Sequence, residues 1–417
     1  MNNINISGIT IDSGKITVRF TVSPDMEKYF NADTFTTEYN ADLTGVPISL
    51  ALIPFVSNIL PIIWLTDAEL QLPELDKDFF NSISEFKRGY ESMFPMFEFK
   101  GNVRCDNIVN NASTTVESPH AAAFFSGGVD AFATLIAHAE EKPTLITLWG
   151  SDITHDDTAG WDIVKQHTLQ TACQFGVNTT FIKTTFRTFI NDIELNRLVK
   201  SSGDSYWHGF QHGIGLIGHA APLVWKDGVR KLYIASSYTA EHHVTCASDP
   251  TIDNYVKMAG CETIHDQYEF DRQEKVDHIC EYAKGGKEKP TLRVCWITSG
   301  GRNCCKCEKC LRTMFEIFAT GQDPREYGFP YTSNDLRAAR RTIISNYCGS
   351  SVPYWIAIRK RFQAVPSLQI PREIEWIRTI DFDKERRSIG FLCYRTAIFS
   401  KRLPGRIIRK LKRIFIK

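Results

Sequence analysis

Residues 121–135 read AAAFFSGGVDAFATL, and this stretch decides the fold. Its first five residues are apolar and predict a buried strand. The SGGVD segment at 126–130 predicts a tight turn, and the apolar spacing after it predicts a helix. Such a turn directs unpaired backbone N–H groups at one point, where the helix dipole adds positive potential. Because glycines let phosphate oxygens approach the backbone closely, we predict an anion site built for phosphate.

The glycine spacing separates this turn from other phosphate-binding loops. No lysine follows the glycines as in GxxxxGK[ST], and the pattern is not GxGxxG. An ordinary strand–turn–helix corner is the alternative, because SGG by itself is common.

SGGVDA resembles the SGGxDS signature of the PP-loop ATP pyrophosphatases, which split ATP between its α and β phosphates and activate an oxygen as an adenylate. The resemblance implies an adenine nucleotide alpha hydrolase-like fold. It also implies that the pyrophosphate of ATP and its Mg²⁺ are held by Ser126, Gly127, Gly128, Val129 and Asp130, with Ser126 and Asp130 in catalysis. Ala131 replaces the last serine of the signature, which removes a hydroxyl worth about 1–2 kcal/mol.

Composition restricts the class of protein. A chain of 417 residues predicts two or three domains. Since 49 basic residues nearly balance 48 acidic ones, no global field favours nucleic acid or membrane. The polar N-terminus does not resemble a signal peptide, so the 12 cysteines indicate metal ligands or free thiols in the cytoplasm. The apolar segment 48–65 contains two prolines and is interpreted as buried strand and loop, without a transmembrane helix.

Three parts are expected along the chain: a β-rich N-terminal domain at 1–115, a PP-loop domain at 116–325 and a helical, basic region at 326–417. The first part carries no recognisable chemistry. It is either a structural cap or oligomerisation module, in a homo-oligomer or a larger complex, or it recruits substrate. Its expected elements are strands at 5–10, 15–22 and 97–109, the last a strand pair, and a helix at 75–90.

From residue 121 strands and helices alternate. Further strands are expected at 145–149, 180–183 and 231–236, and helices at 161–174 and 204–223. This alternation predicts an α/β fold, a parallel sheet with helices on both faces. In such sheets ligands bind beyond the carboxyl ends of the strands.

Polar or aromatic side chains follow several of these strands. Trp149 and Gly150 are candidates to contact a purine, and Arg187 is a candidate to neutralise phosphate. Asp249 lies in a long polar loop and would coordinate Mg²⁺ or bind substrate; capping a turn or helix is the equal alternative. His208 and His212 have the spacing of a metal pair, although such histidines more often cap or fill a groove.

The second motif is a cysteine array, C-x8-C-x2-C-x2-C. It comprises Cys295, Cys304, Cys307 and Cys310, and its four thiolates fit a closed, structural Zn²⁺ site. Cys304 is preferred over the adjacent Cys305 because it keeps the x2 spacing. Clustered free thiols or another fourth ligand are the alternatives.

The two motifs together resemble the QueC family of 7-cyano-7-deazaguanine synthases, over about half of the chain. Arg312 and the segment EKVDHI at 274–279 also match. The resemblance implies a C–N bond-forming ligase that adenylates a carboxyl group of a 7-deazaguanine-type substrate before ammonia attacks. The long extensions at both ends indicate an enlarged paralogue, of a kind known in bacterial antiviral defence, with another amine or a nucleic-acid base as acceptor.

Two further functions remain open from the sequence. One is a nucleotide-binding scaffold that has lost turnover, which Ala131 permits, and the other is tRNA modification by sulfur transfer. The basic C-terminal segment RIIRKLKRIFIK fits a docked amphipathic helix, a protein or nucleic-acid acceptor, or an anionic membrane surface.

Overall fold

The computed structural model describes residues 2–112, 120–295, 301–349, 351–364 and 370–388. The chain forms two compact units, residues 1–302 and 303–417. The sequence suggested boundaries at residues 115 and 325 instead. Each unit is described by itself below.

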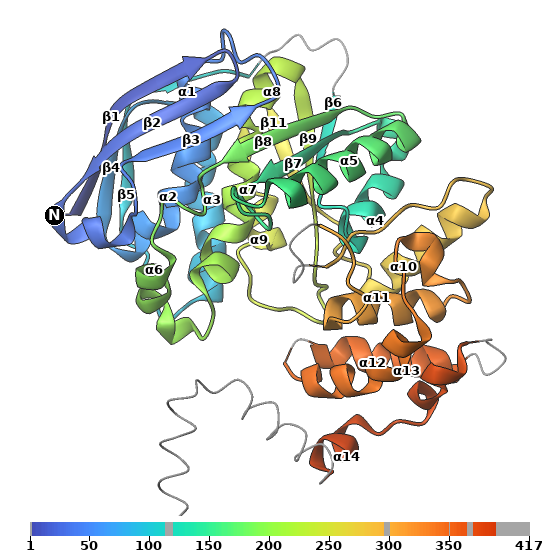
Figure 1. Ribbon diagram of the computed structural model, residues 1–417. Helices are drawn as coiled ribbons and strands as arrows, with labels where there is room; N and C mark the ends of the chain where they lie inside the picture. Colours follow the sequence, from blue (N-terminus) through green and yellow to red (C-terminus); the bar gives the residue numbers. More distant parts are fainter. Residues whose placement is uncertain (1, 113–119, 296–300, 350, 365–369, 389–417) are drawn as a thin grey trace, which may run out of the picture. The chain divides into compact units, whose positions relative to one another are not determined.

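The first unit is an α/β structure around one large, mixed and mostly parallel sheet (Figure 1). The strand order is β10-β11-β9-β6-β7-β8-β3-β2-β1-β4-β5. The strands are β1 Asn2–Asp12, β2 Lys15–Val22, β3 Thr34–Tyr39, β4 Ala68–Asp76, β5 Asn102–Val109, β6 His120–Phe124, β7 Thr144–Trp149, β8 Thr179–Thr184, β9 Val229–Ala235, β10 Lys257–Met258 and β11 Cys261–Asp266.

The centre of the sheet contains the four parallel strands that the sequence predicted, β6 to β9. Consecutive residues of β6 are buried, which places packed side chains on both faces. Ala121 and Ala123 pack with Tyr233 on one face, whereas Ala122 joins the main core on the other. A fifth parallel strand, β11, was not predicted, because CETIHD contains too many polar residues to read as a buried strand.

The N-terminal strands continue this same sheet. β3 pairs antiparallel with β8, with Thr37 opposite Thr184, and the predicted β1–β2 hairpin follows it. The strand pair expected at 97–109 is a single strand, β5, parallel to β4. The first 112 residues therefore share a sheet and a core with the glycine turn.

The interpretation of residues 48–65 as strand and loop is wrong. They form two buried helices, α1 (Ile48–Ala51) and α2 (Ile53–Leu65). Pro54 lies in the first turn of α2, where no N–H is needed, and Pro61 is accommodated inside the helix. A helix that is apolar all round buries every face, so it lacks the periodicity by which helices are recognised. Among the described residues, no helix has the length and hydropathy that a membrane span requires.

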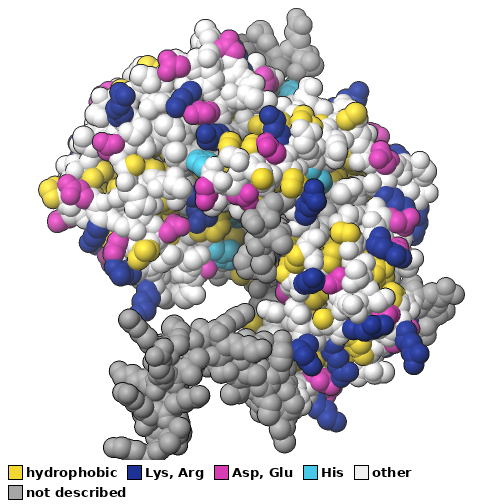
Figure 2. All heavy atoms as spheres, viewed as in Figure 1, with side chains coloured by type: hydrophobic (Ala, Val, Ile, Leu, Met, Phe, Trp, Pro, Cys, Tyr) yellow, Lys and Arg dark blue, Asp and Glu magenta, His cyan; other side chains and the backbone are white. Residues whose placement is uncertain are grey.

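The remaining helices of the first unit cover the sheet. They are α3 Lys77–Met93, α4 Val129–Ala137, α5 Thr158–Phe175, α6 Asp192–Leu198, α7 His212–Ile217, α8 Ala221–Asp227, α9 Pro250–Asp253 and α10 Arg272–Lys284. The helix expected at 204–223 is interrupted: a π-helical segment, Trp207–Gln211, precedes α7, and a 3-10 turn separates α7 from α8. Acidic and basic side chains are interspersed over the face of this unit in Figure 2.

The second unit is helical in its described part, as predicted for the C-terminal region. It contains α11 Glu308–Phe318, α12 Ser333–Asn346, α13 Ser351–Ala364 and α14 Phe382–Arg387. Pro353 lies in the first turn of α13, where proline is tolerated. The basic segment RIIRKLKRIFIK lies outside the described residues.

Candidate functional site

The glycine turn has the backbone expected from its sequence. β6 ends at Phe124, and α4 begins at Val129 with Gly128 as its N-cap. Gly127 has φ +77°, a left-handed conformation that favours glycine. No side chain caps the N-terminus of α4, and the Gly128 N–H lies 3.4 Å from Ser126 Oγ. The first turn of α4 thus directs backbone N–H groups toward the carboxyl end of the sheet.

Two cationic side chains from the start of α10 face this turn. Arg272 Nη1 lies 3.3 Å from Asp130 Oδ2, and Lys275 Nζ lies 3.8 Å from Asp130 Oδ1. Both cations are almost completely buried, with side-chain exposures of 5% and 1%. Burial lowers the pKa of Lys275, and the neighbouring Asp130 carboxylate opposes that shift. Lys275 also donates to the carbonyl oxygen and Oγ of Ser236, at the end of β9, both at 2.8 Å.

A third cation, Arg293, holds the turn from the other side. Its Nε and Nη2 atoms donate to the Ser126 carbonyl oxygen at 3.1 and 2.7 Å, and its backbone N–H donates to Gly127 O at 2.7 Å. Arg272 and Lys275 thus face the Asp130 carboxylate, and Arg293 contacts the backbone of the same turn beside a helix N-terminus. Cations and a helix N-terminus gathered at one turn suit an anionic ligand.

Sequence reasoning missed these three basic residues. The segment at 274–279 was matched to the family, but its Lys275 and the nearby Arg272 were not connected with the glycine turn. Their spacing of three residues at a helix start, which places both on one face, was the available signal. Arg293 stands on a segment without periodicity, and only the tertiary structure connects it with residue 126.

The aromatic residue predicted to contact a purine has a structural partner. The Trp149 ring stacks on Trp161 with centroids 5.2 Å apart, and its indole N–H donates to Thr154 O at 3.1 Å. Gly150 has φ +110°, and a Cβ there would lie 2.3 Å from Thr184 O. Gly150 therefore permits close approach of neighbouring chain segments. This packing is sufficient to explain a glycine at this position, and no ligand is needed to explain it.

Arg187 and Asp249, the other predicted catalytic residues, are both engaged within the protein. Arg187 pairs with Asp192 at 2.9 Å and lies 4.0 Å above the centroid of the Trp207 ring. Asp249 is the N-cap of α9, accepts from Thr251 N at 2.9 Å, and contacts His243 Nε2 at 2.8 Å. The capping role, one of the two alternatives for Asp249, is present in the structure.

His208 and His212 have different partners. His208 Nδ1 lies 2.5 Å from Asp204 Oδ2, while His212 makes an edge contact with the Trp207 ring. The π-helical segment between them removes the regular one-turn spacing on which the metal-pair interpretation depended.

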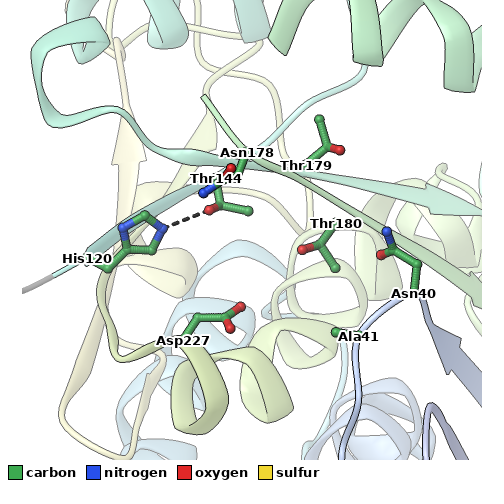
Figure 3. A pocket seen from close by; sticks show the side chains of 8 residues that line it. All are labelled: Asn40, Ala41, His120, Thr144, Asn178, Thr179, Thr180 and Asp227. Atoms are coloured by element: carbon green, nitrogen blue, oxygen red, sulfur yellow. Dashed lines mark hydrogen bonds between the residues drawn. The ribbon is translucent and has the colours of Figure 1, made fainter. Parts of the chain in front are cut away.

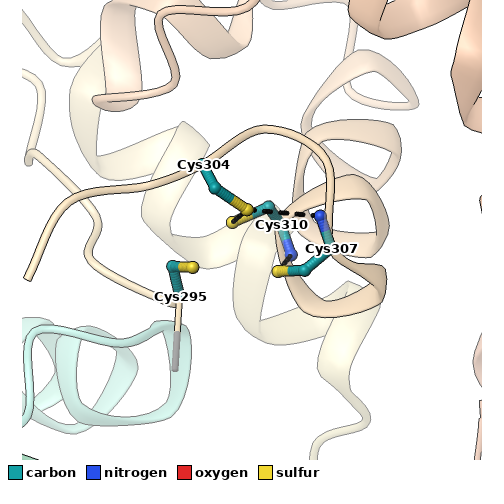
Figure 4. A group of neighbouring side chains, drawn as sticks. All are labelled: Cys295, Cys304, Cys307 and Cys310. Atoms are coloured by element: carbon teal, nitrogen blue, oxygen red, sulfur yellow. Dashed lines mark hydrogen bonds between the residues drawn. The ribbon is translucent and has the colours of Figure 1, made fainter. Parts of the chain in front are cut away.

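Four cysteines lie together as a candidate metal centre. The sulfur atoms of Cys295, Cys304, Cys307 and Cys310 all lie within 4.8 Å of one another (Figure 4). Zn–S bonds of about 2.3 Å in a tetrahedron place sulfurs about 3.8 Å apart, so this donor set fits Zn²⁺. In the part of the chain that the structure describes, no other group of three or more His, Cys, Asp or Glu residues is placed to hold a metal.

The backbone of the cysteine turn supports thiolates. Cys304 Sγ accepts from the N–H groups of Lys306 and Cys307 at 3.4 and 3.3 Å, and Cys307 Sγ accepts from Cys310 N at 3.4 Å, which caps α11. Cys305 has φ +56°, and its sulfur lies 3.9 Å from Asn303 O instead. Cys305 is thus part of the turn, and its sulfur does not belong to the four-sulfur group.

A polar cavity of about 410 Å³ lies at the other end of the parallel strands (Figure 3). His120, Thr144 and Thr179, the first residues of β6, β7 and β8, line it together with Asp227. Because the cavity is at the amino ends of the strands, it is separate from the glycine turn at their carboxyl ends.

Searches against family models, curated proteins and solved structures found no match to this chain. The function must therefore be argued from the residues themselves.

Proposed function

We propose that this protein is an ATP-dependent, AMP- and pyrophosphate-forming enzyme that activates a carboxyl group as an adenylate for attack by an amine. The observation that carries the proposal is the set of three cations, Arg272, Lys275 and Arg293, around a glycine turn at a helix N-terminus. A pyrophosphate leaving group develops negative charge as the α-phosphorus–oxygen bond breaks. Fixed cations and backbone N–H groups stabilise such charge without reorganisation.

The resemblance to 7-cyano-7-deazaguanine synthases supports the choice of substrate, a carboxylated 7-deazaguanine. In this proposal Ser126, Gly127 and Gly128 bind the pyrophosphate through hydroxyl and backbone N–H groups. Asp130 would hold Mg²⁺, which neutralises phosphate charge, and Arg272 and Lys275 would turn from Asp130 to the phosphate oxygens. The four cysteines would hold Zn²⁺ in a structural role.

A nucleotide-binding scaffold without turnover is the second candidate. Ala131 favours it, because this position on α4 is buried and offers no hydroxyl to a phosphate. Sulfur transfer is disfavoured: burial raises the pKa of the Cys246 thiol to about 12, which leaves little thiolate at neutral pH.

The test uses purified, zinc-replete protein with α-labelled ATP, Mg²⁺ and 7-carboxy-7-deazaguanine, with and without ammonium. We expect substrate-dependent AMP and pyrophosphate. Asp130→Ala should abolish turnover, whereas Arg272→Met and Lys275→Met should weaken ATP binding about 10- to 100-fold, the range of a lost charge-assisted hydrogen bond.

Lys257→Ala is the matched control, since Lys257 is an exposed lysine on the edge strand β10 of the same sheet. Circular dichroism would establish that each variant folds. Formation of ADP instead of AMP would refute the assignment, and ATP binding without turnover would favour the scaffold.

A further inference from the structure

His208 lies on an irregular segment that contacts the loop following β9. It lies on the π-helical turn Trp207–Gln211, a geometry that recurs at functional sites. Its side chain is half-buried, with 34% exposed, and the N–H of Ala247 donates to its carbonyl oxygen at 2.8 Å. The loop that follows β9 therefore holds this turn in place.

The ring nitrogens of His208 have distinct partners. Nδ1 lies 2.5 Å from the Asp204 carboxylate, and Nε2 lies 3.4 Å from the Tyr238 hydroxyl. When Nδ1 carries the proton and donates it to a carboxylate, Nε2 of the neutral ring keeps its lone pair. A carboxylate on one ring nitrogen, and a lone pair on the other that can accept a proton, is the arrangement of a general base.

A short series of contacts connects His208 with the glycine turn. Lys275, which lies 3.8 Å from Asp130, donates to both oxygens of Ser236. Tyr238 follows Ser236 by two residues, a span of at most about 7 Å of chain. The hydroxyl of Tyr238 then reaches His208. All of these residues belong to the first unit; Asp130 follows the carboxyl end of β6, and Ser236 and Tyr238 follow that of its neighbour β9.

We infer that His208 is the general base that takes the proton from the amine attacking the acyl adenylate, with Asp204 as its positioning residue. The inference rests on the proposed function and specifies its second step. The amine nitrogen forms a bond to the acyl carbon, the bond from that carbon to the AMP oxygen breaks, and AMP leaves with the electron pair. The proton lost by the nitrogen goes to His208 Nε2 and from there to water.

The chemistry of the acceptor explains why a base is needed. An alkyl ammonium group with a pKa of about 10 is almost entirely protonated at neutral pH and has no lone pair for attack. A histidine titrates near the working pH and is the usual group for such a transfer. The acceptor class is therefore a primary amine or ammonia, which must lose a proton before or during attack.

The test separates the two half-reactions in His208→Asn, whose amide nitrogen can still donate to Asp204 but which has no Nε2. Exchange of labelled pyrophosphate into ATP with 7-carboxy-7-deazaguanine and no amine measures adenylation. Amide formation with ammonium measures transfer. We expect exchange within about threefold of wild type, and transfer reduced about 100-fold or more at pH 7.

Two readouts distinguish a base from a structural residue. Hydroxylamine, which is largely unprotonated at neutral pH, should restore transfer in His208→Asn. The pH–rate profile of His208→Asn should also lack the acidic limb that the wild-type profile shows. Asp204→Asn should move the acidic limb to a different pH and should retain most of the pyrophosphate exchange activity. His242→Asn, an exposed histidine on the same loop, is the matched control and should behave as wild type.

Equal loss of exchange and transfer in His208→Asn, or no loss of either, would overturn the inference while leaving adenylation established. Absence of exchange in the wild-type protein would reject the proposed function and the inference with it.

Discussion

Gly127 and Gly128 are adjacent in the turn, but the structure constrains them differently. Gly127 has φ +77°, and a Cβ there would lie 2.6 Å from Cε1 of the His167 ring. Gly128 has φ −82°, and a Cβ there would meet nothing closer than Ser126 Oγ at 3.4 Å. The sequence motif treats both as equivalent, whereas only the first is required by the fold.

This difference gives a prediction that separates folding from binding. Gly127→Ala should lower the free energy of unfolding by about 1–3 kcal/mol, because alanine is strained at that φ. Gly128→Ala should keep wild-type stability but lose ATP binding, because its methyl group occupies the space where phosphate would approach the backbone. Urea denaturation and calorimetry measure the two effects. If Gly128→Ala binds ATP as wild type does, phosphate does not approach this turn.

At the scale of elements, sequence patterns predicted the central parallel strands and the first hairpin, but missed β3, β4, β10 and β11 and the buried helix α2. The hairpin β1–β2, the strands β6 to β9 and the helix α5 were all expected. Helix α2 was not, because it is apolar on every side and contains two prolines. The prediction of a single helix at 204–223 also missed the π-helical turn, because its extra residue per turn is not visible in the hydrophobic periodicity.

The start of α11 gives a second prediction, on metal binding. Cys307→Ser should abolish zinc binding and loosen the helix, since Cys307 is both a member of the four-sulfur group and the N-cap of α11. Cys305→Ser is the control and should retain about one zinc ion per chain, the stoichiometry of a closed four-cysteine site. Mass-spectrometric metal analysis with circular dichroism would measure both. A Cys307→Ser protein that keeps its zinc would contradict the ligand assignment.

At the scale of the whole molecule, residues far apart in sequence are joined through buried polar contacts. His219 is fully buried. Its Nδ1–H donates to Gly215 O, its Nε2 pairs with Thr184 Oγ1, and its backbone carbonyl oxygen accepts from the Tyr39 hydroxyl. Burial lowers the pKa of His219 to about 4. The neutral ring thus forms part of the contact between the N-terminal strands and the centre of the sheet.

This burial predicts how stability depends on pH. Below the unfolded-state pKa of about 6.5, His219 takes up a proton in the unfolded chain but not in the folded protein. The free energy of unfolding therefore falls as the pH falls toward 4. Between pH 7 and pH 5 the loss from this residue should be about 2 kcal/mol. The raised pKa of His138, which hydrogen-bonds Asp266, acts in the opposite direction. The comparison is therefore made between wild type and His219→Asn by urea denaturation at both pH values. An equal loss in the two proteins would disprove this origin.

The sequence by itself determined the local features of this protein: the strand–glycine turn–helix at 121–135, the alternation of strands and helices after it, and the cysteine spacing. Each depends on residues near one another along the chain, where backbone preference and periodicity act. Only the tertiary structure decided which distant groups meet there. Arg272, Lys275 and Arg293 reach the turn, and Tyr238 meets His208, because parallel strands bring their carboxyl ends to one edge. The N-terminal strands join the same sheet because an open edge at β8 accepts β3, a pairing between segments about 145 residues apart that leaves no local signal.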